Sequence, residues 1–369
     1  MRRIFQAAVT VATAAMLLGC GPTAKEKKVI EDLTSKMETI CIGRFVMNVP
    51  QDVKIKGDVK LYFGLDESYK TVDVSIESSD STTAAMRAEM DAEAQKIDKG
   101  DKNWKTKKSM LLDYRVIDDH MIYLRKQYSF ESAAGSKHEL HLLVGKTQLV
   151  LNADSFEGVP EAGRYEPDGK VETPEQVAAR LFKIAGEIRA VDSPERAGPG
   201  YCLGPVVIDS NQDEEEGNTY MFLDQYPDFH LSVYNKGLTP DDPSDLLAQR
   251  AKAASVYSQV HAFRNRDITL GGMKAHEWLG RLTDYDHDDI TLLKFVAESM
   301  RANPALERPY VNINLDTGGQ LVRGPEADVG KYVSSSLTPK EGMAMWDAMI
   351  PSIRLRPDAI RSSGSGTAH

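Results

Sequence analysis

The chain has 369 residues, with 45 lysines and arginines against 55 aspartates and glutamates, and its formal net charge is -10 at pH 7. This length can supply two domains, each with its own core. The acidic balance argues against nucleic acid as a partner, and it disfavours a body that lies flat on anionic lipid.

The N-terminus carries the pattern of an export signal over residues 1–19. Two arginines precede an apolar stretch over residues 4–18, which is too short for a permanent transmembrane helix but typical of a signal peptide. The tetrapeptide Leu17-Leu18-Gly19-Cys20 resembles a bacterial lipoprotein box, which implies that Cys20 is acylated. An ordinary secretory signal with an incidental cysteine is the alternative.

We therefore expect a lipoprotein in the periplasm, held at a membrane by its N-terminus. Gly21 rather than aspartate follows the cysteine, and by resemblance to enterobacterial lipoproteins this favours the outer membrane. Residues 20–40 are predicted to be a lipid anchor and a polar tether. Its polar part, residues 21–38, would extend on the order of 60 Å if fully stretched. Residues 362–369 are small and polar, and we expect a flexible tail over residues 359–369.

The rest of the chain consists of two divergent copies of one domain. The copies cover residues 41–191 and 202–358, and a linker at 192–201 joins them. Cys41-Ile42-Gly43 opens the first copy and Cys202-Leu203-Gly204 opens the second, 161 positions later. Such a long period indicates paired domains and not a short-repeat solenoid.

Both copies also close alike. Thr173-Pro174-Glu175-Gln176 returns 165 positions later as Thr338-Pro339-Lys340-Glu341. A threonine N-cap, a proline at the first helical position and a glutamine or glutamate at the third predict a capping box. Each copy therefore ends in a helix, and Trp346 takes the place of Leu181 on its buried face, so we expect a core residue there.

Between these ends, apolar residues alternate with polar ones, as in Val72 to Ile76 and Phe229 to Val233. One further helix interrupts the strands of each copy. This order predicts an α+β fold with two related domains, each a mainly antiparallel sheet packed with two helices. His138 and His141 fall within a strand pattern and are expected on a sheet surface.

Cys41 and Cys202 are the only cysteines besides Cys20. Export would place them in an oxidising compartment, where they could form one disulfide. The alternative is that each is a separate buried thiol at the start of its own strand. Two thiols without clustered histidines do not predict a zinc site.

Catalytic and metal-binding patterns are missing from the sequence. No Gly-x-Ser-x-Gly elbow is present, so a serine hydrolase of that type is not indicated. Asp284, Asp286 and Asp288 have the spacing of calcium-loop ligands, but Asp289 and Phe295 stand where that loop requires glycine and glutamate. A solvated turn is the better interpretation. We expect no enzyme activity, no metal and no cofactor.

One loop differs strongly between the copies. The short turn at Gly145 and Lys146 is replaced by residues 300–309 in the second copy. Loops on a rigid scaffold commonly supply recognition, although a harmless insertion is the alternative. We expect this loop and the acidic turn to form a partner-binding surface near the cleft between the domains, with these contact residues: Arg301, Leu306, Arg308, Asp284, Asp286 and Asp288.

The opening motifs and three later segments resemble a known family. These segments are Thr317-Gly318-Gly319, Ser335 to Thr338 leading to Trp346, and Ser352 to Pro357. Together they are similar to the immunity proteins paired with type VI secretion phospholipase effectors, in the family with distinct N- and C-terminal domains that protects against the fourth lipase-effector class.

This resemblance implies a protein without enzyme activity that binds its cognate lipase in the periplasm, as a monomer or in a 1:1 complex, and blocks access to membrane lipid. It supplies no catalytic residue. The main alternative is an envelope lipoprotein that binds a small ligand or an assembly partner. An exported hydrolase is the weakest reading because its catalytic residues are missing.

Overall fold

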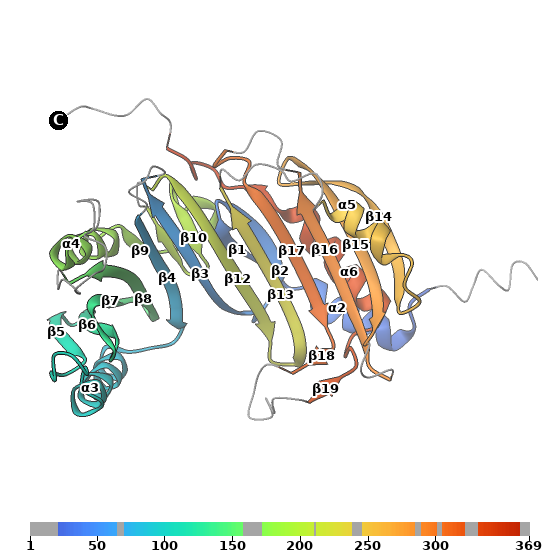
Figure 1. Cartoon of the computed structure of the whole chain (residues 1–369). Coiled ribbons are helices and arrows are strands. Elements are labelled where there is room, and N and C mark those ends of the chain that lie inside the picture. The colour runs from blue at the N-terminus through green and yellow to red at the C-terminus, as the bar shows by residue number, and fades with distance from the viewer. Residues whose placement is uncertain are drawn as a thin grey trace, which may run out of the picture.

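A computed structural model describes residues 21–64, 70–157, 172–209, 212–237, 246–284, 289–300, 305–321 and 331–361 (Figure 1). Residues 1–20 lie outside this range, and with them the expected signal peptide and Cys20.

Among the described residues, the helix α2 (Ala24–Thr34) precedes the first copy. The first copy contains these elements in chain order: β1 (Met37–Gly43), β2 (Phe45–Pro50), β3 (Lys54–Phe63), β4 (Lys70–Ser78), α3 (Thr83–Lys99), β5 (Leu111–Asp118), β6 (Met121–Ser129), β7 (Ser132–Val144), β8 (Thr147–Phe156), α4 (Pro174–Ala185) and β9 (Ile188–Ala190). The short helix η1 (Pro194–Arg196) follows.

The second copy repeats this order: β10 (Tyr201–Leu203), β11 (Val206–Ile208), β12 (Glu214–Leu223), β13 (Tyr226–Lys236), α5 (Leu247–Ala254), β14 (Val260–Leu270), β15 (Met273–Thr283), β16 (Thr291–Ser299), β17 (Tyr310–Thr317), α6 (Pro339–Met349) and β20 (Arg354–Leu355). Two short strands, β18 (Gly319–Gln320) and β19 (Tyr332–Val333), form a small ribbon before α6. The expected α+β class with mainly antiparallel sheets is confirmed.

One twelve-stranded sheet runs through both copies (Figure 1). Its order is β14-β15-β16-β17-β13-β12-β3-β4-β8-β7-β6-β5. The strands β12 and β3 lie at its centre, one from each copy, and equivalent strands of the two copies follow in the same order from there to the two edges. These two strands pair antiparallel from Glu214 opposite Tyr62 to Phe222 opposite Lys54. The copies therefore share a continuous sheet, and no cleft separates their strands at this boundary.

Two glycines allow the close packing at this boundary. A Cβ atom on Gly217 would lie 2.2 Å from the Tyr201 hydroxyl and 2.7 Å from the Asp58 carbonyl oxygen. A Cβ atom on Gly57 would lie 2.5 Å from the Asn218 carbonyl oxygen. Larger residues at either position would push the strands apart.

A second sheet of six short strands is built from the ends of both copies, in the order β20-β2-β1-β10-β11-β9. The closing strand β9 of the first copy pairs with β11 of the second, and the closing strand β20 of the second pairs with β2 of the first. The copies thus exchange their opening hairpins.

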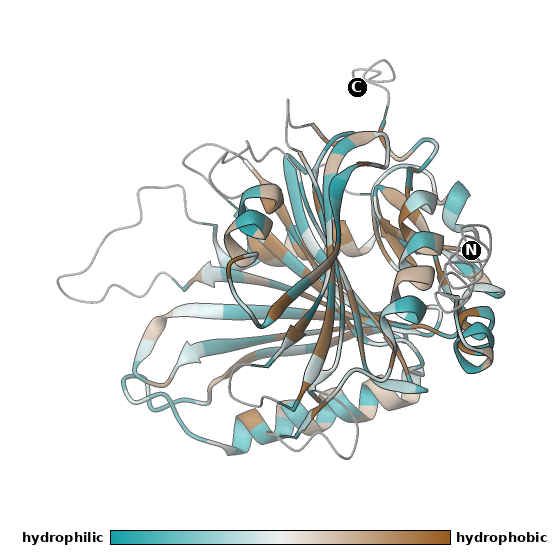
Figure 2. Cartoon of the chain, turned by 90° about the vertical axis from the view of Figure 1, so that its right-hand side faces the viewer, coloured by the Kyte–Doolittle hydropathy of each residue, from teal (hydrophilic) through white to brown (hydrophobic). Residues whose placement is uncertain are grey.

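Each hydrophobic core contains the opening hairpin of the other copy. Ile42, Phe45 and Met47 of the first opening hairpin pack in a core made otherwise mainly of second-copy residues. Leu203 and Val206 of the second hairpin pack in the core of the first copy. Hydrophobic residues accordingly concentrate between the layers (Figure 2). The repeat boundaries seen in the sequence are therefore not the boundaries of the two cores.

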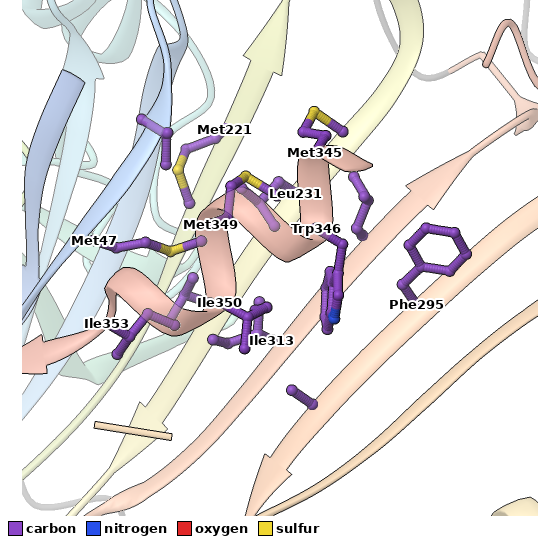
Figure 3. Close-up of a cluster of buried hydrophobic side chains, with 14 of the residues drawn as sticks. Met47, Met221, Leu231, Phe295, Ile313, Met345, Trp346, Met349, Ile350 and Ile353 are labelled. Atoms are coloured by element: carbon purple, nitrogen blue, oxygen red, sulfur yellow. The ribbon is translucent and has the colours of Figure 1, made fainter. Parts of the chain in front are cut away.

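The two capped helices form as predicted. In each, the threonine side chain accepts a hydrogen bond from the backbone of the third helical residue, Gln176 in α4 and Glu341 in α6. Trp346 is fully buried, as expected for a core residue, and its ring meets that of Phe295 edge-on (Figure 3). Its indole nitrogen donates to Glu277 at 3.0 Å.

The expected extended tether is wrong for most of its length. Thr23 caps α2 through a capping box with Glu26, and Leu33 on this helix is fully buried in the core beneath α6. Lys340 of α6 also donates to the carbonyl oxygen of Gly21 at 2.9 Å. The polar composition hid a helix that docks through a few apolar residues.

The first three residues of the predicted tail, 359–361, pack against the rest of the protein. Ala359 is buried, and its carbonyl oxygen accepts hydrogen bonds from Arg44 at 2.5 Å and from the backbone of Gly200 at 3.0 Å. Arg361 reaches Asp209 at 2.8 Å. The rest of the expected tail, residues 362–369, lies outside the described residues.

Candidate partner-binding face

The helices α3 and α5 cover the two ends of one face of the long sheet. The strand register places Ile122, which packs against α3, on the same face as His276 at the far side of the sheet. The outward residues between them include Asp58, Asn218 and Tyr234. We call the part of this surface on β3, β12, β13 and β17, between α3 and α5, the open face (Figure 1).

A tyrosine and carboxylate cluster lies at one end of the open face. Tyr62 and Tyr234 donate to the two oxygens of Glu216 at 3.0 and 2.7 Å. Lys236 lies 2.9 Å from the same carboxylate, and the ring of Tyr310 meets Tyr234 edge-on. Partial burial raises the pKa of Glu216, but hydrogen bonds from Tyr234, Lys236 and Tyr62 outweigh it, so the pKa stays below its usual value. This carboxylate therefore remains charged.

Aromatic rings occupy the other end of the open face. His230 stacks on Tyr220 with ring centroids 5.6 Å apart, and Phe222 lies 5.2 Å from the same imidazole. All three side chains are partly exposed. Aromatic residues of this kind supply large contact area at a low cost in conformational entropy.

Each flanking helix leaves a cleft against the sheet. The cleft below α5 has a volume of about 340 Å³ and is mainly apolar, with Leu247, Ala251, Trp278 and Val296 among its lining residues. The cleft below α3, with about 320 Å³, is lined mostly by charged groups from α3, β6 and β7. The copies thus present chemically different surfaces at equivalent places.

The sequence-predicted contact residues do not form one cluster. Asp284 follows β15 and precedes the start of β16, whereas Leu306 and Arg308 follow its other end. With nine residues in β16, these positions lie roughly 30 Å apart along the strand. Asp284 is therefore not adjacent to Leu306 and Arg308, and these residues do not line a cleft between the domains as expected. The remaining contact residues, Asp286, Asp288 and Arg301, lie outside the described part of the chain.

The loop nevertheless adjoins the open face. A Cβ atom on Gly237, which directly follows β13, would lie 3.5 Å from the Leu306 side chain. Leu306 is therefore next to the end of the strand that carries Tyr234 and Lys236. Arg308 is exposed, and its backbone donates to Ala305 at 2.9 Å, which gives this part of the loop a defined turn. The sequence did not reveal the open face, because the polar residues on β12 and β13 look like those of any strand with one side in solvent.

The cysteines lie behind the sheet, away from the open face. Cys41 and Cys202 form a disulfide with their Cα atoms 5.6 Å apart. It joins the two exchanged opening hairpins at the pair β1 and β10. Of the two alternatives left by the sequence, the structure has the paired form.

One serine and histidine pair resembles catalytic chemistry. His138 lies 2.7 Å from both the Ser155 and Tyr123 hydroxyls. The imidazole is completely buried, contrary to the expected surface position, and burial lowers its pKa to about 4. With no exposed imidazole edge to meet a substrate, this group acts as a buried polar network.

Neither a metal cluster nor a membrane span is found in the part of the chain that the structure describes. No group of three or more His, Cys, Asp or Glu side chains there could hold a metal ion. Among these residues no helix is long and apolar enough to cross a membrane.

Two family models match this chain. Residues 38–185 match the Tle cognate immunity protein 4 N-terminal domain, and residues 196–358 match the C-terminal domain of the same family. Together they span most of the sequence and place it among immunity proteins. The chain belongs to the Tle cognate immunity protein 4 family, as its motifs predicted. No curated protein matches the sequence closely enough to indicate common ancestry.

Solved structures share the fold over nearly the whole chain. A Tle4-Tli4 complex contains a chain with a TM-score of 0.59 and 18% identity, covering 88% of this chain and 99% of that one. The apo immunity protein TplEi of the type VI secretion system from Pseudomonas aeruginosa has a TM-score of 0.56 and 18% identity, with 87% and 97% covered. TplEi with a peptide called L has a TM-score of 0.52 at 18% identity, with 88% and 99% covered.

Proposed function

We propose that this protein binds and inhibits a cognate type VI secretion lipase in the periplasm, and so protects the membrane lipids of the cell that makes it. The family assignment carries this proposal. It is supported by the structures of a Tle4-Tli4 complex and of TplEi, which share the fold. The protein needs no catalytic group of its own for this role.

The N-terminal sequence supports the proposed location. A lipid on Cys20 would hold the protein at a membrane, with the outer membrane favoured by Gly21. The folded part begins almost immediately after this position, because α2 starts at Ala24 and packs on α6. Without a long tether, the inhibitor would stay close to the membrane that the lipase attacks.

The open face is the contact surface that we propose for the lipase. It combines aromatic rings at one end with a hydrogen-bonded cluster of tyrosines and charge at the other. A rigid sheet keeps these groups in place without the entropy cost of ordering a loop on binding. The loop with Leu306 and Arg308 and the turn at Asp284 flank opposite ends of this face, so a partner that covers it would meet both.

Calorimetry with the lipase and matched variants tests this surface. Phe222→Ser should weaken binding about tenfold, as expected for loss of an aromatic anchor. Leu355→Ser is the control, because Leu355 is also a partly exposed apolar residue but lies on β20 of the six-stranded sheet. Replacing residues 301–308 with a short Gly/Ser linker should also weaken binding while thermal stability stays nearly unchanged.

Equal affinities for all three variants and the wild type would reject the open face. The apolar cleft below α5 favours one other function, an envelope lipoprotein that binds a small apolar ligand, because its volume lies within the range of ligand pockets. Lipase binding that persists when Leu247→Trp fills this cleft would argue against that alternative.

A further inference from the structure

A loop at the far end of the first copy exposes aromatic residues beside a dense group of lysines. Trp104 follows α3 and is 59% exposed, and Phe130, at the turn between β6 and β7, is 43% exposed. Their ring centroids lie 5.5 Å apart. Tyr128 in the same hairpin is 56% exposed. Single exposed apolar residues are common on protein surfaces, but a cluster indicates an interaction site.

The charge of this loop is opposite to that of the whole protein. Residues 99–108 contain five lysines and one aspartate, whereas the whole chain has a net charge of -10. Four of these lysines, Lys102, Lys105, Lys107 and Lys108, surround Trp104 in sequence and are exposed. We call these lysines together with Trp104 and Phe130 the basic aromatic tip.

The tip is held in a defined shape. Asn103 is fully buried, and its side-chain amide donates to the carbonyl oxygens of Ser129 and Ser132 at 3.2 and 3.0 Å. Its side-chain oxygen accepts from the backbone of Lys105 and Thr106 at 3.0 and 2.9 Å. The backbone of Trp104 also donates to Phe130 at 2.7 Å. The exposed indole is therefore fixed by the fold and does not result from a frayed loop.

The equivalent turn of the second copy shows what is special here. After α5, Val256 and Tyr257 are also exposed, at 80% and 62%. That turn, residues 255–259, contains no lysine or arginine. Exposed apolar residues thus occur in both copies, but only the first surrounds them with positive charge.

We infer that the basic aromatic tip docks on an anionic phospholipid surface. Indole rings partition into the interface between headgroups and acyl chains, and lysines near a membrane surface each add about 1 kcal/mol of attraction to anionic lipid. Asp101 and Glu131 lie within or beside the tip, but the five lysines of residues 99–108 outnumber them. Acidic groups farther away oppose the attraction little, because charges beyond about 10 Å are largely screened at physiological salt. The tip is thus attracted to anionic lipid, although the negative net charge of the whole protein predicts repulsion.

This contact would be a second one, separate from the N-terminal lipid. The elements that carry the tip, α3, β5 and β6, lie at the opposite end of the long sheet from α2 (Figure 1). Attachment at both ends would hold the sheet along the membrane surface and restrict the orientation of the open face. The inference does not depend on which protein that face binds.

The tryptophans provide a direct test. The chain has three, and Trp278 and Trp346 are buried, so Trp104 is the one that can report contact with lipid. The full-length protein is mixed with vesicles of phosphatidylglycerol or of phosphatidylcholine alone. The emission of Trp104 should shift to the blue and lose its acrylamide quenching with phosphatidylglycerol only. Trp104→Phe should abolish the response, which assigns it to this residue.

A matched pair of variants tests the role of the lysines. Lys105→Ser, Lys107→Ser and Lys108→Ser together should raise the lipid concentration at half-response about a hundredfold. The control removes three exposed lysines elsewhere, with Lys56→Ser, Lys146→Ser and Lys274→Ser, and should respond like the wild type.

Three results would overturn the inference: no response to phosphatidylglycerol, an equal response to both lipids, or equal effects of the two triple variants. The alternative is that the tip contacts a protein and not lipid. In that case Trp104→Ser should bind the lipase more weakly than the wild type but should bind vesicles equally well in flotation. That outcome would also reject the lipid surface. The lipase experiments on the open face use other residues, so failure of one proposal leaves the other testable.

Discussion

The guanidinium of Arg44 donates to both carboxylate oxygens of Glu215, at 2.7 Å each, and both side chains are buried. Arg44 lies in the turn of the first opening hairpin, and Glu215 lies on β12 of the second copy. Gln212 donates to the same carboxylate at 2.6 Å. This ion pair therefore ties the exchanged hairpin to the long sheet.

Arg44→Ala should lower the free energy of unfolding by about 3 to 5 kcal/mol, because it leaves a buried carboxylate without its partner. The control is Lys146→Ala, which removes an ion pair with Asp80 that is almost fully exposed and should cost less than about 1 kcal/mol. Urea unfolding of both variants measures the difference. Similar, small losses would show that the Arg44 pair does not hold the hairpin.

The disulfide should stabilise the same arrangement. Cys41 and Cys202 are separated by 161 positions. In the entropic account, a crosslink that closes a loop of that length reduces the conformational entropy of the unfolded chain, which stabilises the folded state by about 4 to 5 kcal/mol. The oxidised protein should therefore unfold at a higher urea concentration than the double variant Cys41→Ser and Cys202→Ser. Equal mobility on reducing and non-reducing gels, with both thiols alkylated after denaturation without reductant, would contradict the pairing.

Acid should destabilise the protein through His138. Burial lowers the pKa of this imidazole to about 4, whereas in the unfolded chain its value is about 6.5. Between these values the unfolded state binds a proton that the folded state does not. The free energy of unfolding therefore falls as the pH drops below about 6.5, by up to about 1.4 kcal/mol per pH unit, until about pH 4.

His138→Gln should flatten this dependence, even if it lowers stability at pH 7 by disturbing the contacts with Tyr123 and Ser155. Urea midpoints at pH 7, 6 and 5 provide the comparison. Burial raises the pKa of Glu139, but hydrogen bonds and nearby lysines outweigh it and lower the pKa from 4.5 to about 2. The stability that this group contributes is lost only as the pH falls below about 4.5, which is under the range of the pH 7, 6 and 5 comparison. A parallel fall in both proteins would assign the acid sensitivity to other groups.

Cys20→Ser should move the protein from the salt-washed membrane fraction to the soluble fraction. The physical reason is that acyl chains on this residue supply the stable membrane anchor that we propose. The salt wash removes the weaker electrostatic contact of the basic aromatic tip. Thermal stability should not change, because every described element lies after this residue. Full membrane association after the wash would rule out Cys20 as the anchor.

The sequence predicts the duplicated plan because local signals mark it. Gly43 and Gly204 have φ of 56° and 59° at the equivalent hairpin turns, and Thr173 and Thr338 cap equivalent helices. The exchange of hairpins leaves no such signal. Both hairpins carry the same apolar pattern, so only the tertiary structure shows which core each one joins.

The misread tether and the open face show two further limits. Thr23 and Glu26 form a capping box that is visible in the sequence, but few apolar residues follow it, and the helix at Ala24–Thr34 depends on packing of Leu33 against the rest of the protein. The exposed sides of β12 and β13 look like any solvated strand. Their role as one surface arises only when β12 pairs with β3.

The most direct test of the proposed function is a titration of the purified cognate lipase with this protein, with hydrolysis of phospholipid vesicles as the readout. We expect lipase activity to fall linearly with added protein and to reach zero at one equivalent. Vesicle concentration should not change that end point, because the inhibitor binds the enzyme and does not merely cover the lipid. Full lipase activity in the presence of a large molar excess of the folded protein would contradict the account.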